Sequence, residues 1–170
     1  GRPSLRRRKS MRLQGYDYAQ PGAYFVTLCT QDRACIFGEI VGSQMRSNTM
    51  GHIVADCWQA IPSHFQTVEL DAWVAMPNHF HGIVWITDVP VGASHAAPLH
   101  ASPPPRRPLG TIVGSFKSAT ARRINTLRGT PGMPVWQRNY HERIVRSHAS
   151  LNDIREYIHV NPARWAMDRE

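Results

Sequence analysis

The chain has 170 residues, 42% of them hydrophobic, which suits one domain large enough to bury a core. Lysine and arginine total 20 against 12 acidic residues, and the resulting net charge of +8 favours a polyanionic partner. No apolar run is long enough to span a bilayer, and no hydrophobic segment follows the Arg-rich start. We therefore expect neither a membrane anchor nor a signal peptide. Composition does not separate DNA from RNA.

The cysteines indicate a reducing environment. There are three of them, an odd number, and none has the CxxC spacing of a zinc or redox motif. A disulfide framework and a zinc cluster are both unsupported, so we expect Cys29, Cys35 and Cys57 to be free thiols in a cytoplasmic protein.

Residues 1–20 form a basic N-terminal arm that ends in two tyrosines, Tyr16 and Tyr18. A solvated terminus is one interpretation. A nucleic-acid contact is the other, because rings stack on bases while guanidinium groups hold phosphates. The arginines concerned are Arg6, Arg7, Arg8 and Arg12.

The first half of the chain predicts three strands and one helix. Residues 23–30 are rich in β-branched and aromatic side chains after Pro-Gly, which indicates a strand. Residues 51–65 carry apolar side chains at helical spacing, with Pro62 weakening the helix near its end. Residues 70–76 and 79–86 then indicate two strands joined by a tight Pro-Asn connection.

In residues 88–108 the composition changes to Pro, Ala, Gly, Ser and His, which is typical of a flexible insertion. Helical spacing returns at residues 112–124, and residues 129–134 end that helix. Basic side chains are interleaved with its apolar ones: Lys117, Arg122 and Arg123.

The end of the chain predicts a short strand at 143–145 and a final helix that runs to Asn161, before Pro162. Ser150 and Asp153 have the spacing of a capping box at the start of this helix. The order β-α-β-β-α-β-α predicts one α+β domain, a ferredoxin-like antiparallel sheet with helices packed on it.

His79 and His81 are the strongest local signal. Alternate residues of a strand project from the same face, which places these side chains about 7 Å apart at Cα. Two imidazoles at that separation can close on one metal ion, although a pair of hydrogen-bonded core histidines fits the spacing as well. Ile83 and Trp85 continue their face, while Phe80 lies on the opposite one.

The final helix supplies candidate partners for the histidines. Tyr157 and Asn161 are four residues apart and share one helical face beside the apolar stripe of Leu151 and Ile158. At the edge of the buried surface, Asn161 could offer an amide oxygen to a metal and Tyr157 could reach a substrate. A tyrosine at a core margin is the simpler interpretation of Tyr157 taken alone.

Five segments together resemble the REP-associated tyrosine transposases, relatives of single-tyrosine insertion-sequence transposases in the HUH endonuclease superfamily. His-hydrophobe-His alone is weak evidence, but the ordered set with Trp-Gln-Arg and Tyr-x-x-x-Asn-Pro is specific. The segments are RRKSMRLQGYDY (7–18), GAYFVTLCT (22–30), AWVAMPNHFHG (72–82), VWQRNYHERIV (135–145) and IREYIHVNPARW (154–165).

The resemblance implies an enzyme that cuts and rejoins single-stranded DNA through a covalent phosphotyrosine. His79 and His81 match the metal-binding pair, Tyr157 matches the nucleophile, and Asn161 stands where related enzymes have an amide third ligand, often Gln. Tyr140 is the rival nucleophile. A phenol has a pKa of about 10 and needs activation at neutral pH. The family implies Mg²⁺ or Mn²⁺, and imidazole ligands favour Mn²⁺.

The implied substrate is single-stranded or hairpin DNA, which would place the enzyme at the nucleoid, as a monomer or a homodimer. Besides the arm, candidate phosphate contacts are Lys117, Arg122, Arg123 and Arg138. A non-catalytic nucleic-acid-binding module on the same scaffold is the alternative. A histidine-triad nucleotide hydrolase would need a third histidine at the position of Ile83.

Overall fold

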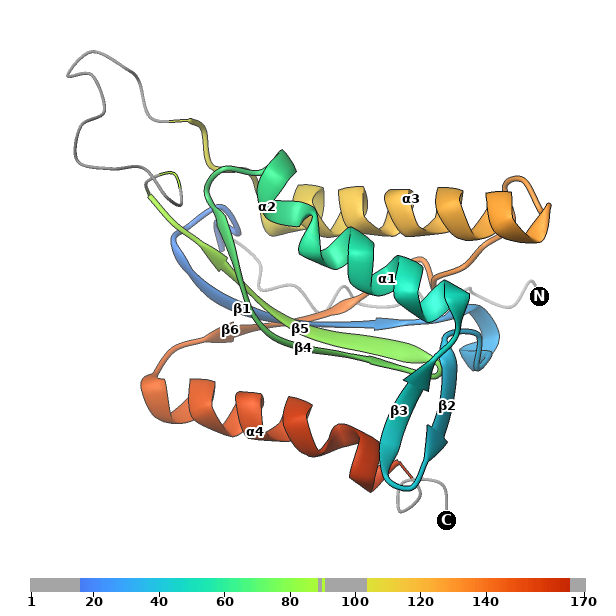
Figure 1. Ribbon diagram of the computed structural model, residues 1–170. Helices are drawn as coiled ribbons and strands as arrows, with labels where there is room; N and C mark the ends of the chain where they lie inside the picture. The colour runs from blue at the N-terminus through green and yellow to red at the C-terminus, as the bar shows by residue number, and fades with distance from the viewer. Residues whose placement is uncertain (1–15, 89, 91–103, 166–170) are drawn as a thin grey trace, which may run out of the picture.

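A four-stranded antiparallel sheet forms the centre of the protein in the computed structural model, which describes residues 16–88, 90 and 104–165 (Figure 1). Its strands, in spatial order, are β4 (Val68–Met76), β5 (His79–Ile86), β1 (Gly22–Cys29) and β6 (His141–Val145). Every neighbouring pair is antiparallel, and a register shift interrupts the β4–β5 pairing.

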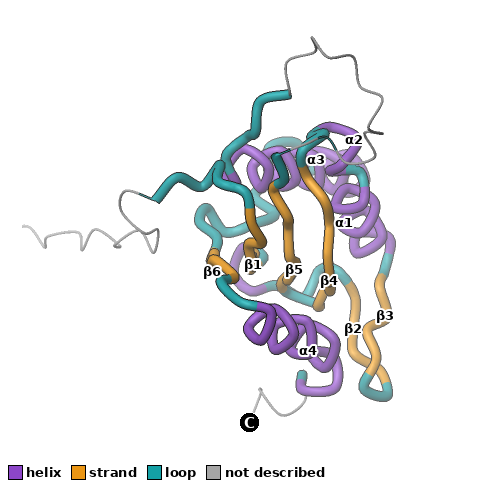
Figure 2. Tube along the Cα trace, turned by 90° about the vertical axis from the view of Figure 1, so that its left-hand side faces the viewer, coloured by secondary structure: helices purple, strands orange, loops and turns teal. Residues whose placement is uncertain are grey.

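Helices cover both faces of this sheet, as Figures 1 and 2 show from two sides. Helices α1 (Thr49–Gln59), α2 (Ile61–His64) and α3 (Leu109–Arg128) lie on one face, and α4 (His148–Arg164) lies on the other. When these four strands are numbered 1 to 4 along the chain, their order across the sheet is 2-3-1-4, which is the order of a ferredoxin-like fold. The α+β prediction is confirmed.

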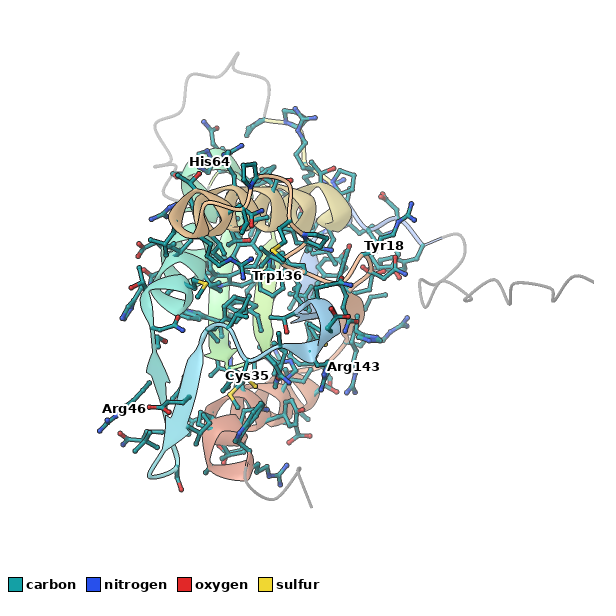
Figure 3. The ribbon with its side chains drawn as sticks, turned by 90° about the vertical axis from the view of Figure 1, so that its right-hand side faces the viewer. Tyr18, Cys35, Arg46, His64, Trp136 and Arg143 are labelled. Carbon is teal, nitrogen blue, oxygen red and sulfur yellow. The ribbon has the colours of Figure 1, made fainter. Side chains whose placement is uncertain are left out.

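The larger hydrophobic core fills the space between the sheet and helices α1 and α3. Strand alternation directs Tyr24, Val26 and Leu28 of β1 into it. Trp136 lies under α3 (Figure 3), where its indole nitrogen donates to Thr120 Oγ1 at 2.8 Å. Packing in this core also requires a glycine after His81, because a Cβ at Gly82 would lie 2.5 Å from the Trp58 ring.

The smaller core lies between the sheet and α4. Its five buried members are Ala23, Ile83, Leu151, Ile154 and Ile158. An ion pair reinforces it, because Arg155 Nε and Nη2 donate to the two carboxylate oxygens of Asp71 at 2.9 and 2.6 Å. Trp85 Nε1 donates to the same carboxylate at 2.9 Å. Helix α4 is thus fastened to β4 and β5 close to Tyr157.

Several elements differ from the sequence prediction. The helix expected at 51–65 is two helices, since α1 ends at Gln59 and Pro62 is accommodated in the first turn of α2. A hairpin of β2 (Gly38–Val41) and β3 (Gln44–Ser47), which the sequence did not predict, stands beside the end of α4. A short 3-10 turn, Gln31–Arg33, follows β1 and was also not predicted.

Helix α4 begins earlier and ends later than predicted. Its N-cap is Ser147, whose side chain accepts from the Ser150 backbone N–H at 3.1 Å, so the predicted capping box at Ser150 and Asp153 was wrong. The helix also continues through Pro162 to Arg164. A proline lacks the backbone N–H that would donate to the helix. At Pro162 the loss of this one hydrogen bond does not end the helix.

Two predicted segments lie partly outside the described residues: the basic arm, described only from Tyr16, and the insertion at 88–108, described only at 88, 90 and 104–108. Tyr16 and Tyr18 pack edge to face, with ring centroids 4.9 Å apart, and both adjoin the larger core. All three cysteines are free thiols. In the described part of the chain no helix has the length and apolarity to cross a membrane.

Candidate functional site

The two histidines lie side by side on the face of the sheet that α4 covers. Strand β5 pairs with β4 on one side and β1 on the other, so His79 and His81 occupy a central strand. Their ring centroids are 4.7 Å apart, at an interplanar angle of 73°. Ile83, further along the same face, belongs to the smaller core, whereas Phe80 belongs to the larger one. The alternation predicted for this strand is therefore present.

Both imidazoles are oriented through Nδ1. His79 Nδ1 lies 2.8 Å from the side-chain oxygen of Asn78, and His81 Nδ1 lies 2.8 Å from Thr27 Oγ1. Thr27 faces His81 directly in the β1–β5 register. A ring that donates its Nδ1 proton carries its lone pair on Nε2, which is the arrangement found in metal-binding histidines.

His81 is held in its neutral form. Its side chain is 5% exposed, and burial lowers its pKa to about 3, with a smaller contribution from the neighbouring charge of His79. A neutral imidazole is the form that binds a metal ion. No proton has to leave His81 before it can act as a ligand at neutral pH.

Tyr157 reaches these rings from α4. Its ring centroid lies 5.4 Å from that of His81 and 6.3 Å from that of Phe25, which itself stacks on His81. Tyr157 is 40% exposed, so its phenol is accessible to a large substrate. Asn161, one turn later, is 6% exposed, and its amide nitrogen donates to the Tyr157 carbonyl at 3.2 Å. That bond directs the amide nitrogen back to the helix, so Oδ1 is the side-chain atom that could bind a metal ion.

These side chains line a half-open pocket of about 310 Å³. Trp165, the residue directly after the end of α4, adds its indole, which stacks on His79 with centroids 6.1 Å apart. The pocket is lined by Thr27, Cys29, Arg33, Asn78, His79, His81, Tyr157, Asn161 and Trp165.

The donor set of the pocket fits a divalent cation. Within the described residues, no group of three or more His, Cys, Asp or Glu side chains is arranged to hold a metal, so a metal ion bound by the histidine pair would need a ligand of another kind. The amide oxygen of Asn161, which lines the same pocket, has the right chemistry. Two imidazoles and one amide oxygen would leave coordination positions for substrate oxygen, and such mixed ligands would suit Mn²⁺ better than Mg²⁺.

The rival tyrosine lies elsewhere. Tyr140 is partly buried against the larger core and does not line the pocket. Only one of the two candidate tyrosines therefore stands beside the histidines.

The four predicted DNA contacts that the structure describes do not line the pocket. Lys117 Nζ donates to the backbone oxygens of Gln137 and Arg138 at 2.8 and 3.2 Å, and burial lowers its pKa. Arg123 pairs with Asp56 at 3.6 Å on α3, across the sheet from α4. The remaining candidates are exposed, at Arg122 and Arg138, or lie outside the described residues, at Arg6, Arg7, Arg8 and Arg12.

Besides Cys29, four pocket residues were not predicted as functional. Thr27 and Asn78 orient the histidines, Trp165 covers His79, and Arg33 brings a positive charge. Asn78 could have been found from its position directly before His79 in a tight turn. Thr27 and Arg33 could not, because only strand pairing and the turn after β1 bring them to β5.

Comparison with known proteins gives one close relative and a similar fold. No protein-family model matches the chain. An uncharacterised protein of Haemophilus influenzae is 38% identical over 173 residues, covering 97% of this chain and 93% of the relative. The solved structure of a REP-associated tyrosine transposase bound to a REP hairpin is similar with a TM-score of 0.60 and 16% identity, covering 91% of this chain and 74% of that one.

Proposed function

This chain belongs to the same family as the Haemophilus influenzae protein and has the fold of a REP-associated tyrosine transposase, and from this premise we propose that it cuts and rejoins DNA. The proposed activity is that of a metal-dependent single-strand endonuclease and strand transferase, which works through a covalent phosphotyrosine intermediate. The observation that carries the proposal is the position of Tyr157, 5.4 Å between ring centroids from His81, in one pocket with both histidines.

The residues of the pocket have different proposed roles. His79, His81 and Asn161 would hold Mn²⁺ or Mg²⁺. A divalent cation bound there would withdraw charge from the scissile phosphate. Thr27 and Asn78 fix the imidazole rings, which keeps the ligand geometry in place before substrate arrives. Phe25 packs against both His81 and Tyr157 and so sets the distance between them.

Tyr157 is the proposed nucleophile. Its phenolic oxygen attacks the phosphorus, a Tyr157 Oη–P bond forms and the P–O3′ bond breaks. The phenol proton passes to solvent, and the leaving oxygen takes up a proton to become a free 3′-hydroxyl. Because one phosphoester replaces another, the reverse attack by a 3′-hydroxyl rejoins the strand without a nucleotide triphosphate.

An unpaired strand is the proposed substrate. In-line attack requires the backbone to bend toward Tyr157, which single-stranded DNA permits more easily than duplex. The solved neighbour is bound to a REP hairpin. We extend that substrate class, a folded hairpin beside a single-stranded flank, to this chain. With a net charge of +8, binding should weaken as salt rises.

The proposal is tested with an end-labelled hairpin that carries a 5′ single-stranded flank, incubated with Mn²⁺. The wild type should cleave it and become covalently labelled, Tyr140→Phe should do the same, and Tyr157→Phe should do neither. The same hairpin without its flank and a linear duplex should be cut poorly. Labelling of Tyr157→Phe, or cutting of all three DNAs at one rate, would contradict the proposal.

A further inference from the structure

Arg33 lies at the pocket but belongs to none of the roles described so far. It ends the 3-10 turn Gln31–Arg33, directly after β1, and its side chain lines the pocket together with His79, His81 and Tyr157. Its guanidinium donates to Cys29 Sγ at 3.0 Å, and a thiol sulfur is a weak acceptor.

Charge distinguishes Arg33 from the other residues of the pocket. Among the residues that the structure describes, no carboxylate lines the pocket, and Arg33 is the one lining side chain with a fixed positive charge. No ion pair joins Arg33 to a carboxylate among the described residues. A cation that has no carboxylate partner among the described residues, in a half-open pocket, is suited to bind an anion from solution.

The backbone at Arg33 is held in an uncommon conformation. Asp32 and Arg33 both have positive φ, 57° and 56°, in the left-handed region that disfavours residues with a Cβ. Thr30 fastens the turn, since its hydroxyl donates to the Ala34 carbonyl at 2.8 Å. Asn78 donates to the Arg33 carbonyl at 3.3 Å while its side-chain oxygen meets His79 Nδ1. One amide therefore links the orientation of His79 to the position of Arg33.

We propose that Arg33 is a phosphate-binding catalytic residue, whose guanidinium holds a non-bridging oxygen of the scissile phosphate while Tyr157 attacks. This inference rests on the proposed function. Arg33 transfers no proton. Its N–H groups donate to an oxygen on which negative charge grows as the Tyr157 Oη–P bond forms and the P–O3′ bond breaks, so the interaction is stronger in the transition state than in the bound substrate.

Three variants test this role. Arg33→Ala removes the charge, and Arg33→Lys keeps it without the forked donors. Arg46→Ala removes one charge from the hairpin strand β3 (Figure 3), at a residue that does not line the pocket. Single-turnover cleavage by Arg33→Ala should fall by about 100-fold or more, as when an oxyanion donor is removed. Arg33→Lys should recover part of the loss, and Arg46→Ala should stay within about twofold of wild type.

A methylphosphonate at the scissile position separates charge binding from a structural role. It replaces a non-bridging oxygen by a methyl group and so removes the negative charge that Arg33 is proposed to hold. On this substrate Arg33→Ala and wild type should differ by less than about threefold, because the charged oxygen that gained the stabilisation is absent. A loss of equal size on both substrates would overturn the proposal and make Arg33 a residue that only shapes the turn.

A binding measurement decides the case even if no cleavage occurs. In a Tyr157→Phe background, Arg33→Ala should reduce the slope of log affinity for single-stranded DNA against log salt by about 0.7, the value for one phosphate contact. An unchanged slope would overturn the assignment of Arg33. If wild type never forms a Tyr157 adduct, the proposed function fails, and the change in slope still reports whether Arg33 holds a phosphate.

Discussion

The two faces of the sheet differ in what they bury. On the face of α1 and α3, strand side chains and helices form a large, almost entirely hydrophobic cluster. On the face of α4, the buried cluster has five hydrophobic residues, and His79, His81, Thr27 and Asn161 occupy the positions where further core residues would stand. The first face can stabilise the fold, which leaves the second free to carry polar groups that do chemistry.

The α4 face compensates for its small core with specific polar bonds. Several polar groups there have a defined partner, such as Thr27 for His81 and Asp71 for Arg155. A buried polar group without a partner would cost more than a lost hydrophobic contact. We therefore expect changes on the α4 face to affect chemistry more than stability, and changes on the α3 face to do the reverse.

The largest expected effect is on catalysis, from His81→Ala. Losing a ligand of the proposed metal should lower single-turnover cleavage by about 1,000-fold or more, because metal stabilisation of the transition state contributes several kcal/mol. The circular dichroism spectrum should stay that of a folded protein. Retained cleavage by the His79→Ala, His81→Ala double variant, with no effect of chelator on wild type, would refute the metal site.

The corresponding large effect on stability is expected from the other face. Phe116 is 2% exposed and packs against Trp58, Phe80 and Trp136. Phe116→Ala should lower the free energy of unfolding by about 3–5 kcal/mol, measured by urea titration. Leu151→Ala on α4 should cost nearer to about 2 kcal/mol, at the low end for such truncations. An equal cost at both sites would remove the distinction between the faces.

A smaller effect is expected from removing single hydroxyl groups. Thr27→Val deletes the partner of His81 Nδ1 with little change in shape, and should weaken Mn²⁺ binding by about 10–100-fold. The matched control is Thr120→Val on α3, which leaves the Trp136 indole nitrogen without its acceptor. That variant should lose stability and bind Mn²⁺ as wild type does. Calorimetric titration measures both affinities, and equal metal binding by the two variants would contradict the role of Thr27.

The smallest effect is a pH dependence of stability from the ion pair that fastens α4. Hydrogen bonding to Arg155 is the main cause that lowers the pKa of Asp71 from 3.8 to about 2. Because the folded-state pKa is the lower one, this stabilisation is present above about pH 4 and is lost as pH falls toward 2. Asp71→Asn should flatten that part of the urea-midpoint profile, whereas Asp153→Asn should not. If Asp71→Asn kept the wild-type dependence of the urea midpoint on pH, the ion pair would be excluded as the cause of that dependence.

The sequence predicted the elements with regular periodicity. The alternation in β5 gave both faces of the central strand, and the four-residue spacing of Tyr157 and Asn161 placed them together on α4. The β2–β3 hairpin was missed because its strands have four residues each and its turn, at Gly42 and Ser43, lacks an Asn-Gly signal. Proline at 162 suggested a helix end, but the helix continues and brings Trp165 over His79.

The missed site residues share one physical cause. Thr27 is far from His81 in sequence and meets it only through the β1–β5 register. Arg33 reaches the pocket because Asp32 and Arg33 both have positive φ, a conformation that the residue types at these positions do not predict. Local spacing identifies residues that one strand or one helix brings together. Residues that meet across two strands can be identified only when the pairing register of those strands is known.

The central claim is that Tyr157 attacks DNA beside the histidine pair. The most direct measurement is to trap the covalent complex with a single-stranded oligonucleotide in Mn²⁺, digest it with protease and nuclease, and locate the modified residue by mass spectrometry. We predict a phosphodiester-linked nucleotide on Tyr157, with Tyr140 unmodified and no adduct when the metal is chelated. An adduct on Tyr140, or one that forms equally well in chelator, would contradict the account.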